Sequence, residues 1–176
     1  MKRAALIWGS ILGVLLSINL VYMVQLCYTD PDFKPNMVLG YLVILAMLST
    51  VFFSIKSYRD KELKGVISLG LAFKAGALTA FVGATIYVIV WLFIYYLYVP
   101  DFMDKYAAHE LRNAISDGDS ATEIAKLKQD TQTYKELYKS PILVVVFTYL
   151  EVLPLGLVVA FISAFILKRK AAIVTK

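Results

Sequence analysis

The sequence predicts an all-α integral membrane protein, a single membrane domain over residues 1–176 with four transmembrane helices. Three observations predict this class. Hydrophobic residues make up 60% of the chain, and a soluble domain of this length cannot bury so much apolar surface. Four apolar stretches are each long enough to cross a hydrocarbon core, which takes roughly 20 helical residues. Basic residues gather on one side of these stretches, as is typical of loops that stay in the cytoplasm.

The predicted spans cover residues 4–28, 37–55, 75–99 and 142–167. Segment 66–74, between the second and third spans, is bracketed by glycines. If it joined the third span, the helix would be about 50 Å long at 1.5 Å per residue, which is more than a bilayer crossing needs. We interpret segment 66–74 as a short interfacial or partly re-entrant segment, and a tilted helix that protrudes from the bilayer is the alternative.

The orientation follows from the basic residues close to the helix ends. The short loop 29–36 holds Asp30 and Asp32 against Lys34, and the longer loop 100–140 has eight acidic and six basic residues. We therefore predict a multi-pass membrane protein whose two termini and middle loop lie in the cytoplasm. The basic residues on that side are Lys2, Arg3, Lys56, Arg59, Lys61, Lys64, Lys168, Arg169 and Lys170.

Loop 101–140 is predicted to form an extracytoplasmic helical hairpin between the third and fourth spans. Apolar residues recur in it at helical spacing, and a turn is expected near Asp117 and Gly118. Ser120 and Glu123 have the spacing of a capping box, which indicates the start of the second helix. The hairpin could bind a partner outside the membrane, or it could pack only on itself.

The sequence contains none of the motifs that usually indicate catalysis. It has one cysteine, Cys27, and one histidine, His109, which excludes an internal disulfide and a metal site with several histidines. No catalytic residue, cofactor or metal is expected, and the chain is not expected to be an enzyme. The net charge of +5 is explained by membrane topology, and we expect no nucleic acid as a partner.

Glu151 is the residue in the spans that calls for an explanation. It lies near the middle of the fourth span, where an ionised carboxylate costs several kcal/mol unless it is paired, protonated or in contact with water. It is either a site for a proton or a ligand, or a neutral structural group that hydrogen-bonds across helices. Matching depths predict Asn19 as its partner, with Ser17 close by in the same helix, and predict that Glu151 faces the bundle interior.

Small residues four apart predict close helix packing. Gly9 and Gly13 form such a face on the first span, and Gly156 and Ala160 form one on the fourth. Together with the expected contact between Asn19 and Glu151, this predicts that the first and fourth spans touch.

Three residues near the cytoplasmic surface, Tyr58, Arg59 and Lys74, could hold the phosphate of an anionic lipid. The alternative is that these basic residues serve membrane topology alone.

Several blocks of the chain resemble a known family. They are Ser57-Tyr58-Arg59-Asp60-Lys61-Glu62-Leu63, Pro100-Asp101-Phe102, Tyr138-Lys139-Ser140-Pro141 and Thr148-x-x-Glu151-x-x-Pro154-x-Gly156. They are similar to an uncharacterised inner-membrane family of Bacteroidota, catalogued as domain of unknown function 4199. The resemblance covers almost the whole chain and implies a bacterial membrane protein whose family has no established activity.

Three functions remain open at this point. The preferred one is a non-enzymatic subunit or accessory factor of an envelope complex, which contacts the lipid bilayer and a membrane-protein partner or further copies of itself. The first alternative is a small transporter or proton-responsive channel component that uses Glu151. The second alternative is an enzyme that acts on a lipid-linked substrate.

Overall fold

The computed structural model describes residues 1–30, 34 and 36–169, and in this part of the chain it shows six α-helices. All-helical architecture is thereby confirmed. Two predicted topology residues, Asp32 and Lys170, lie outside the described residues. The helices are α1 (Lys2–Thr29), α2 (Met37–Glu62), α3 (Leu69–Leu97), α4 (Phe102–Asp117), α5 (Ala121–Leu137) and α6 (Pro141–Leu167).

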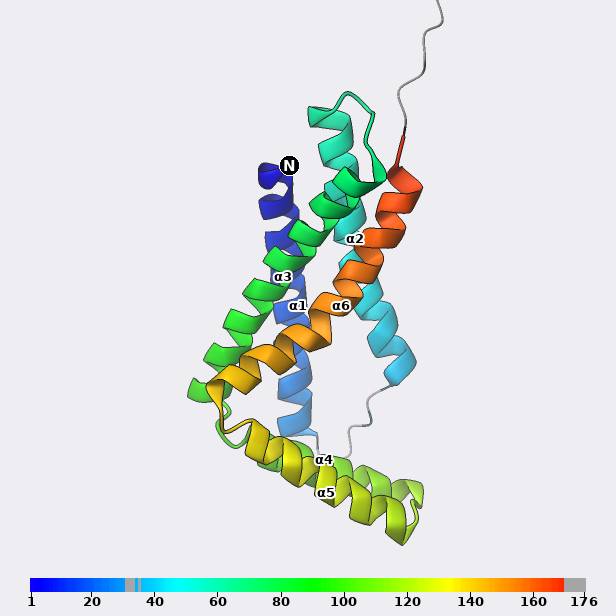
Figure 1. Cartoon of the computed structure of the whole chain (residues 1–176). Coiled ribbons are helices and arrows are strands. Elements are labelled where there is room, and N and C mark those ends of the chain that lie inside the picture. Colours follow the sequence, from blue (N-terminus) through cyan, green and yellow to red (C-terminus); the bar gives the residue numbers. More distant parts are fainter. Residues whose placement is uncertain (31–33, 35, 170–176) are drawn as a thin grey trace, which may run out of the picture.

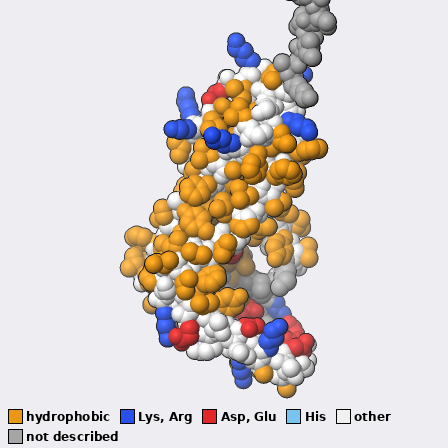
Figure 2. All heavy atoms as spheres, viewed as in Figure 1, with side chains coloured by type: hydrophobic (Ala, Val, Ile, Leu, Met, Phe, Trp, Pro, Cys, Tyr) orange, Lys and Arg blue, Asp and Glu red, His pale blue; other side chains and the backbone are white. Residues whose placement is uncertain are grey.

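Four of these helices, α1, α2, α3 and α6, are long and apolar enough to cross a membrane. They run side by side, and the start of α1, the α2–α3 turn and the end of α6 lie at the same end of the bundle (Figure 1). We name this the basic end, because the lysines and arginines of the predicted cytoplasmic side gather there. Figure 2 shows a wide hydrophobic band between the basic end and the hairpin. Which end faces the cytoplasm stays a prediction.

The interpretation of segment 66–74 as a separate element is wrong. α3 runs without a break from Leu69 to Leu97, a length of 29 residues or about 43 Å. Ser68 caps its first turn by accepting a hydrogen bond from the backbone N–H of Leu71. Glycine is a poor helix former, but at Gly76 the absence of a side chain lets α3 pack closely on α6. A Cβ atom at this position would lie only 2.9 Å from the Cβ of Ala160. The long helix considered as the alternative is therefore the one that forms.

α3 is the central helix of the bundle, since α1, α2 and α6 all pack along it. A Cβ atom on Gly9 would lie 2.7 Å from the Cβ of Val82 in α3, and one on Gly156 would lie 2.8 Å from the Cβ of Ala80. The small faces of α1 and α6 thus both contact α3. The predicted packing of the first span on the fourth is wrong: among the described residues α1 and α6 share no extended contact, because α3 lies between them.

The basic end is closed by contacts between the α2–α3 turn and the end of α6. The backbone of Ile67 exchanges two hydrogen bonds with that of Arg169, at 3.1 and 2.9 Å. The guanidinium of Arg59 donates to the carbonyl of Leu167 at 3.3 Å, which satisfies one of the free carbonyls at the end of α6. Helices α2, α3 and α6 are therefore tied together at this end.

The hairpin formed by α4 and α5 lies across the opposite end of the bundle (Figure 1), and its predicted boundaries agree with the structure. Gly118 ends α4 with a left-handed backbone, φ +79°, a conformation that glycine adopts without strain. The phenol of Tyr28 in α1 donates to Asp101 at 2.7 Å, and Lys34 forms an ion pair with Asp117. These two contacts hold the hairpin to α1 and to the chain between α1 and α2.

The predicted capping box opens α5. The backbone N–H of Glu123 bonds to the hydroxyl of Ser120, and the Glu123 carboxylate accepts from the Ser120 hydroxyl at 2.7 Å and from its backbone N–H at 2.9 Å. These bonds from Ser120 lower the pKa of Glu123 below its usual value. The cap is therefore present above the ordinary glutamate range, and it weakens as the pH falls through the lowered pKa.

Ser120→Ala is expected to loosen the first turn of α5 by about 1 kcal/mol, because the hydroxyl cap is lost. Amide hydrogen exchange in that turn should become about fivefold faster, while exchange in α3 stays unchanged. Ser116→Ala, an exposed serine inside α4, is the matched control and should leave the exchange of α5 unaltered. Equal exchange in both variants would contradict the role of the cap.

Candidate functional site: the Glu151 cavity

The hairpin half of the bundle contains a cavity of about 720 Å³, bounded by α1, α2, α3 and α6 and lined by Glu151. We call it the Glu151 cavity. Its other polar lining residues are Asn19, Tyr87, Lys34 and Asn36. Its remaining walls are apolar or aromatic apart from the backbone of Gly40, and are formed by Leu16, Leu20, Tyr22, Met23, Leu26, Leu39, Tyr41, Val43, Ile44, Val152 and Leu155.

The cavity forms because α2 leaves the bundle in this half (Figure 1). Leu48 at the middle of α2, and Val51 and Ile55 in its second half, have no exposed surface. By contrast, Leu39 and Tyr41 in its first half remain about 60% exposed. At the hairpin end α1, α3 and α6 still pack around an aromatic cluster that includes Trp91 and Tyr95, and no described side chain of α2 belongs to it. The space between α1, α6 and the first half of α2 is thus left unfilled.

Three polar side chains reach the cavity at a common depth. Asn19, Tyr87 and Glu151 each lie ten residues from the hairpin end of their own helix, which corresponds to about 15 Å along the helix. They come from three different helices, α1, α3 and α6. Lys34 and Asn36 lie at the hairpin end, before the start of α2. The cavity thus has a polar group deep inside, apolar walls, and polar residues at its outer rim.

The Glu151 carboxylate is exposed to this cavity, and the described part of the chain offers it no hydrogen bond or ion pair within bonding distance. The expected bond to Ser17 is not formed, because the Ser17 hydroxyl donates to the Gly13 carbonyl of its own helix at 2.7 Å. Asn19 shares the cavity with Glu151, but no hydrogen bond joins them. Glu151 faces the side of α1, across a space rather than in contact with it.

The comparisons with known proteins place the chain in a family. A family model described as a protein of unknown function (DUF4199) matches residues 7–169. The chain belongs to the DUF4199 family. This confirms the resemblance seen in the sequence blocks, and the match includes every residue that lines the Glu151 cavity. No curated protein and no solved structure matches the chain. Together with its four apolar helices, the match indicates that this DUF4199 protein is a membrane protein of unknown activity.

The sequence did not predict the polar contacts that this DUF4199 chain makes inside its helix interfaces. The hydroxyls of Ser54 and Thr79 bond at 2.7 Å between α2 and α3, and Tyr149 donates to Thr85 at 2.9 Å between α6 and α3. Such pairs stabilise helix association by roughly 1 kcal/mol. Hydroxyl residues inside apolar stretches are the signal that could have indicated them. Tyr87, another hydroxyl residue inside an apolar stretch, was also missed.

The residues predicted to contact anionic lipid have different environments. Tyr58 is buried in the main core cluster, and Lys74 is exposed on α3. The Arg59 guanidinium bonds to Asp60 at 2.7 Å as well as to the Leu167 carbonyl. The N–H groups of Arg59 are therefore engaged by Asp60 and by the contact that closes the basic end. A phosphate site shared by Tyr58, Arg59 and Lys74 stays a prediction.

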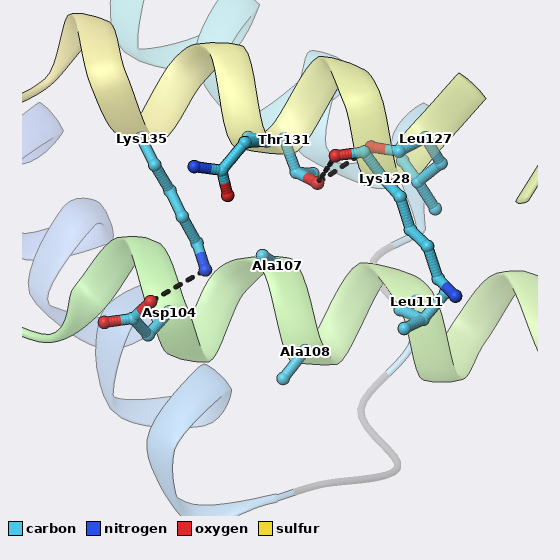
Figure 3. A pocket seen from close by; sticks show the side chains of 9 residues that line it. Asp104, Ala107, Ala108, Leu111, Leu127, Lys128, Thr131 and Lys135 are labelled. Carbon is cyan, nitrogen blue, oxygen red and sulfur yellow. Dashed lines mark hydrogen bonds and ion pairs between the residues drawn. The ribbon is translucent and has the colours of Figure 1, made fainter. Parts of the chain in front are cut away.

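A smaller hollow of about 320 Å³ lies between the two hairpin helices (Figure 3). Asp104 of α4 and Lys135 of α5 form an ion pair across it at 2.7 Å. The Thr131 hydroxyl bonds back to the carbonyls of Leu127 and Lys128. These polar groups already have partners, so the hollow is a weaker candidate site. No cluster of three metal-binding side chains occurs among the residues that the structure describes.

Proposed function

We propose that this DUF4199 protein is a non-enzymatic membrane protein that binds a small amphipathic molecule in the Glu151 cavity. Ligand sites in proteins have volumes of roughly 300–1,000 Å³, apolar walls and a few convergent polar groups. The cavity, at about 720 Å³, falls within this range, and its polar residues are few and lie at defined depths. This develops the transporter alternative raised by the sequence, with binding as its first step.

The state of Glu151 is the observation that carries the proposal. A carboxyl group in apolar surroundings needs a proton, a counter-charge, water or a hydrogen-bonding ligand. The described protein residues supply no bonding partner, although Asn19 and Tyr87 line the same space. A packed structural carboxyl would be bonded across the helix interface, as the Ser54 and Thr79 hydroxyls are. An exposed carboxyl in a cavity instead favours an exchangeable partner.

The second candidate function is an accessory subunit of an envelope complex. The hairpin supports it, because it projects beyond the spans and carries exposed Ile115 and Tyr134. Under this candidate, a membrane-protein partner or a second copy of the chain covers the hairpin. An enzyme for lipid-linked substrates finds no comparable support in the geometry.

Native mass spectrometry of the protein released from its membrane separates the two candidates. If the protein binds a ligand, the spectrum should show one chain, or a homo-oligomer, carrying one discrete small molecule per chain. This small molecule should be absent when Glu151 is replaced by leucine. A subunit predicts a second polypeptide at constant ratio. A bare chain, or only mixed phospholipid in equal amounts on wild type and variant, would overturn the ligand proposal.

The proposed orientation puts the basic end in the cytoplasm and the hairpin outside, in a bacterial inner membrane. To test it, single cysteines replace Lys64 or Gly118 in a chain whose Cys27 is changed to serine. In intact cells, a membrane-impermeant maleimide should label position 118 and not position 64, because only the first lies in the hairpin turn. Labelling at position 64 would reverse the topology, and breaking the inner membrane should expose both positions as a control.

A further inference from the structure

The deep end of the Glu151 cavity has the chemistry of a site for a positively charged ligand. We infer that Glu151 binds a lipophilic organic cation there, and that the cation enters in exchange for a proton. This inference rests on the proposed function and names its ligand class. It follows from which charges face the cavity, from the aromatic groups around it and from the cost of an isolated charge in apolar surroundings.

Among the residues that the structure describes, few charged side chains face the cavity. Its lining from α1, α2 and α3 contains no ionised side chain at neutral pH, only Asn19 and the phenols of Tyr22, Tyr41 and Tyr87. α6 contributes Glu151, and the chain before α2 contributes Lys34 at the rim. Lys34 is already paired with Asp117 of the hairpin. Among the described lining residues, Glu151 is thus an acidic side chain that no basic side chain pairs with. This arrangement favours a cationic ligand and disfavours an anionic one.

The surroundings of the carboxylate favour an organic cation over a metal ion. Calcium and magnesium ions take six or more oxygen ligands, and one carboxylate with an amide and a phenol from other helices does not supply them. A lipophilic cation is more weakly hydrated, so it loses less on leaving water, and its apolar groups match the leucine-rich walls. Tyr22, Tyr41 and Tyr87 come from three helices, and aromatic faces attract organic cations.

The exchange of cation for proton follows from charge balance. An isolated carboxylate in this setting is costly, so the empty site holds a proton on a Glu151 carboxyl oxygen. When a cation binds, the O–H bond breaks, the carboxylate keeps the electron pair, and the proton passes to water. The net charge of the site is zero before and after. Binding should therefore tighten by about tenfold for each pH unit while the empty site is protonated.

The test compares two probes of the same shape and opposite charge, tetraphenylphosphonium and tetraphenylborate, on the purified full chain in detergent. Equilibrium dialysis should show saturable binding of the phosphonium, one per chain, and no saturable binding of the borate. In weakly buffered solution about one proton should be released per phosphonium bound. Glu151→Asp should retain both properties.

Glu151→Gln should weaken phosphonium binding by at least about tenfold and abolish its proton release and its pH dependence. Glu136→Gln, which removes an exposed hairpin carboxylate that pairs with Lys139, is the matched control and should bind as wild type. Gly40→Phe is the second reference variant. Its phenyl ring should block the cavity, because Gly40 lines it.

The outcomes separate the two levels of the proposal. If both probes bind equally well and Gly40→Phe blocks both, the cavity binds ligands but the preference for cations is wrong. If the phosphonium binds without releasing a proton, the exchange is wrong. If neither probe binds, or if binding is the same in Gly40→Phe, the inference and the proposed function both fail.

Discussion

Gly40→Phe is expected to abolish ligand binding in the Glu151 cavity and to leave the fold intact. Gly40 lies in the first half of α2 and lines the cavity. A Cβ atom added to it would meet no atom within 4 Å, so the phenyl ring can enter the open space without displacing a neighbour. The ring then occupies volume that the ligand needs. We expect at least about a hundredfold loss of affinity, equivalent to about 2.7 kcal/mol.

Leu42→Phe is the matched control for this variant. Leu42 lies two residues further along α2, is 58% exposed, and does not line the cavity. Binding of a neutral lipophilic dye such as Nile red, measured by fluorescence titration, should be lost in Gly40→Phe and retained in Leu42→Phe. Both variants should unfold at the wild-type temperature. Wild-type affinity in Gly40→Phe would show that ligands bind elsewhere.

Gly13→Ala is expected to destabilise the protein by forcing α1 away from α3. A Cβ atom on Gly13 would lie 2.6 Å from the Cβ of Ile86 and 3.1 Å from the carbonyl oxygen of Gly83. Neither of these atoms is the free end of a flexible side chain, so α1 and α3 must separate to admit the methyl group. Overpacking of this kind costs roughly 1–3 kcal/mol, and Gly13→Leu should prevent the two helices from packing.

Gly40→Ala makes the same chemical change in α2, where the added methyl group meets no atom within 4 Å. Alanine favours a helix over glycine by roughly 0.5–1 kcal/mol, so this variant should be no less stable than wild type. The difference between the two variants in thermal or denaturant unfolding therefore measures the α1–α3 contact. If both variants unfold alike, the close approach of α1 and α3 is contradicted.

The parts of the fold that could be predicted from the sequence depend on local signals. Apolar runs of sufficient length indicated α1, α2, α3 and α6, since lipid exposure leaves an unbroken hydrophobic pattern. The hairpin boundaries followed from the spacing of Ser120 and Glu123 and from Gly118, because a cap or a left-handed glycine acts within a few residues. These elements agree with the structure to within a few residues except at the end of α2 and the start of α3.

The arrangement of the helices could not be predicted, because it depends on residues far apart in the chain. The faces formed by Gly9 with Gly13 and by Gly156 with Ala160 do show which sides pack closely. They do not name the partner, and α3 offers small residues to both faces at Ala80 and Gly83. The extra turns at the start of α3 were missed because glycines flank them, although Gly76 is there for close packing.

The candidate site was predicted only in part. Glu151 is conspicuous in any apolar stretch, and counting residues placed Asn19 at the same depth. The cavity between them exists because the first half of α2 diverges from the bundle (Figure 1), and nothing in the local pattern of residues 37–47 predicts this. Gly40 and Tyr87 therefore became site residues only once the helices were placed together.

Photo-crosslinking from the cavity wall tests most directly whether a small molecule occupies the Glu151 cavity. A photoreactive amino acid replaces Ile44, which lines the cavity, or Leu42, which faces away from it on the same helix. After illumination of whole membranes, mass spectrometry should find one discrete small-molecule adduct at position 44, and only the general phospholipids of the bilayer at position 42. The same adducts at both positions, or a crosslink from position 44 to another polypeptide, would contradict a ligand-binding cavity.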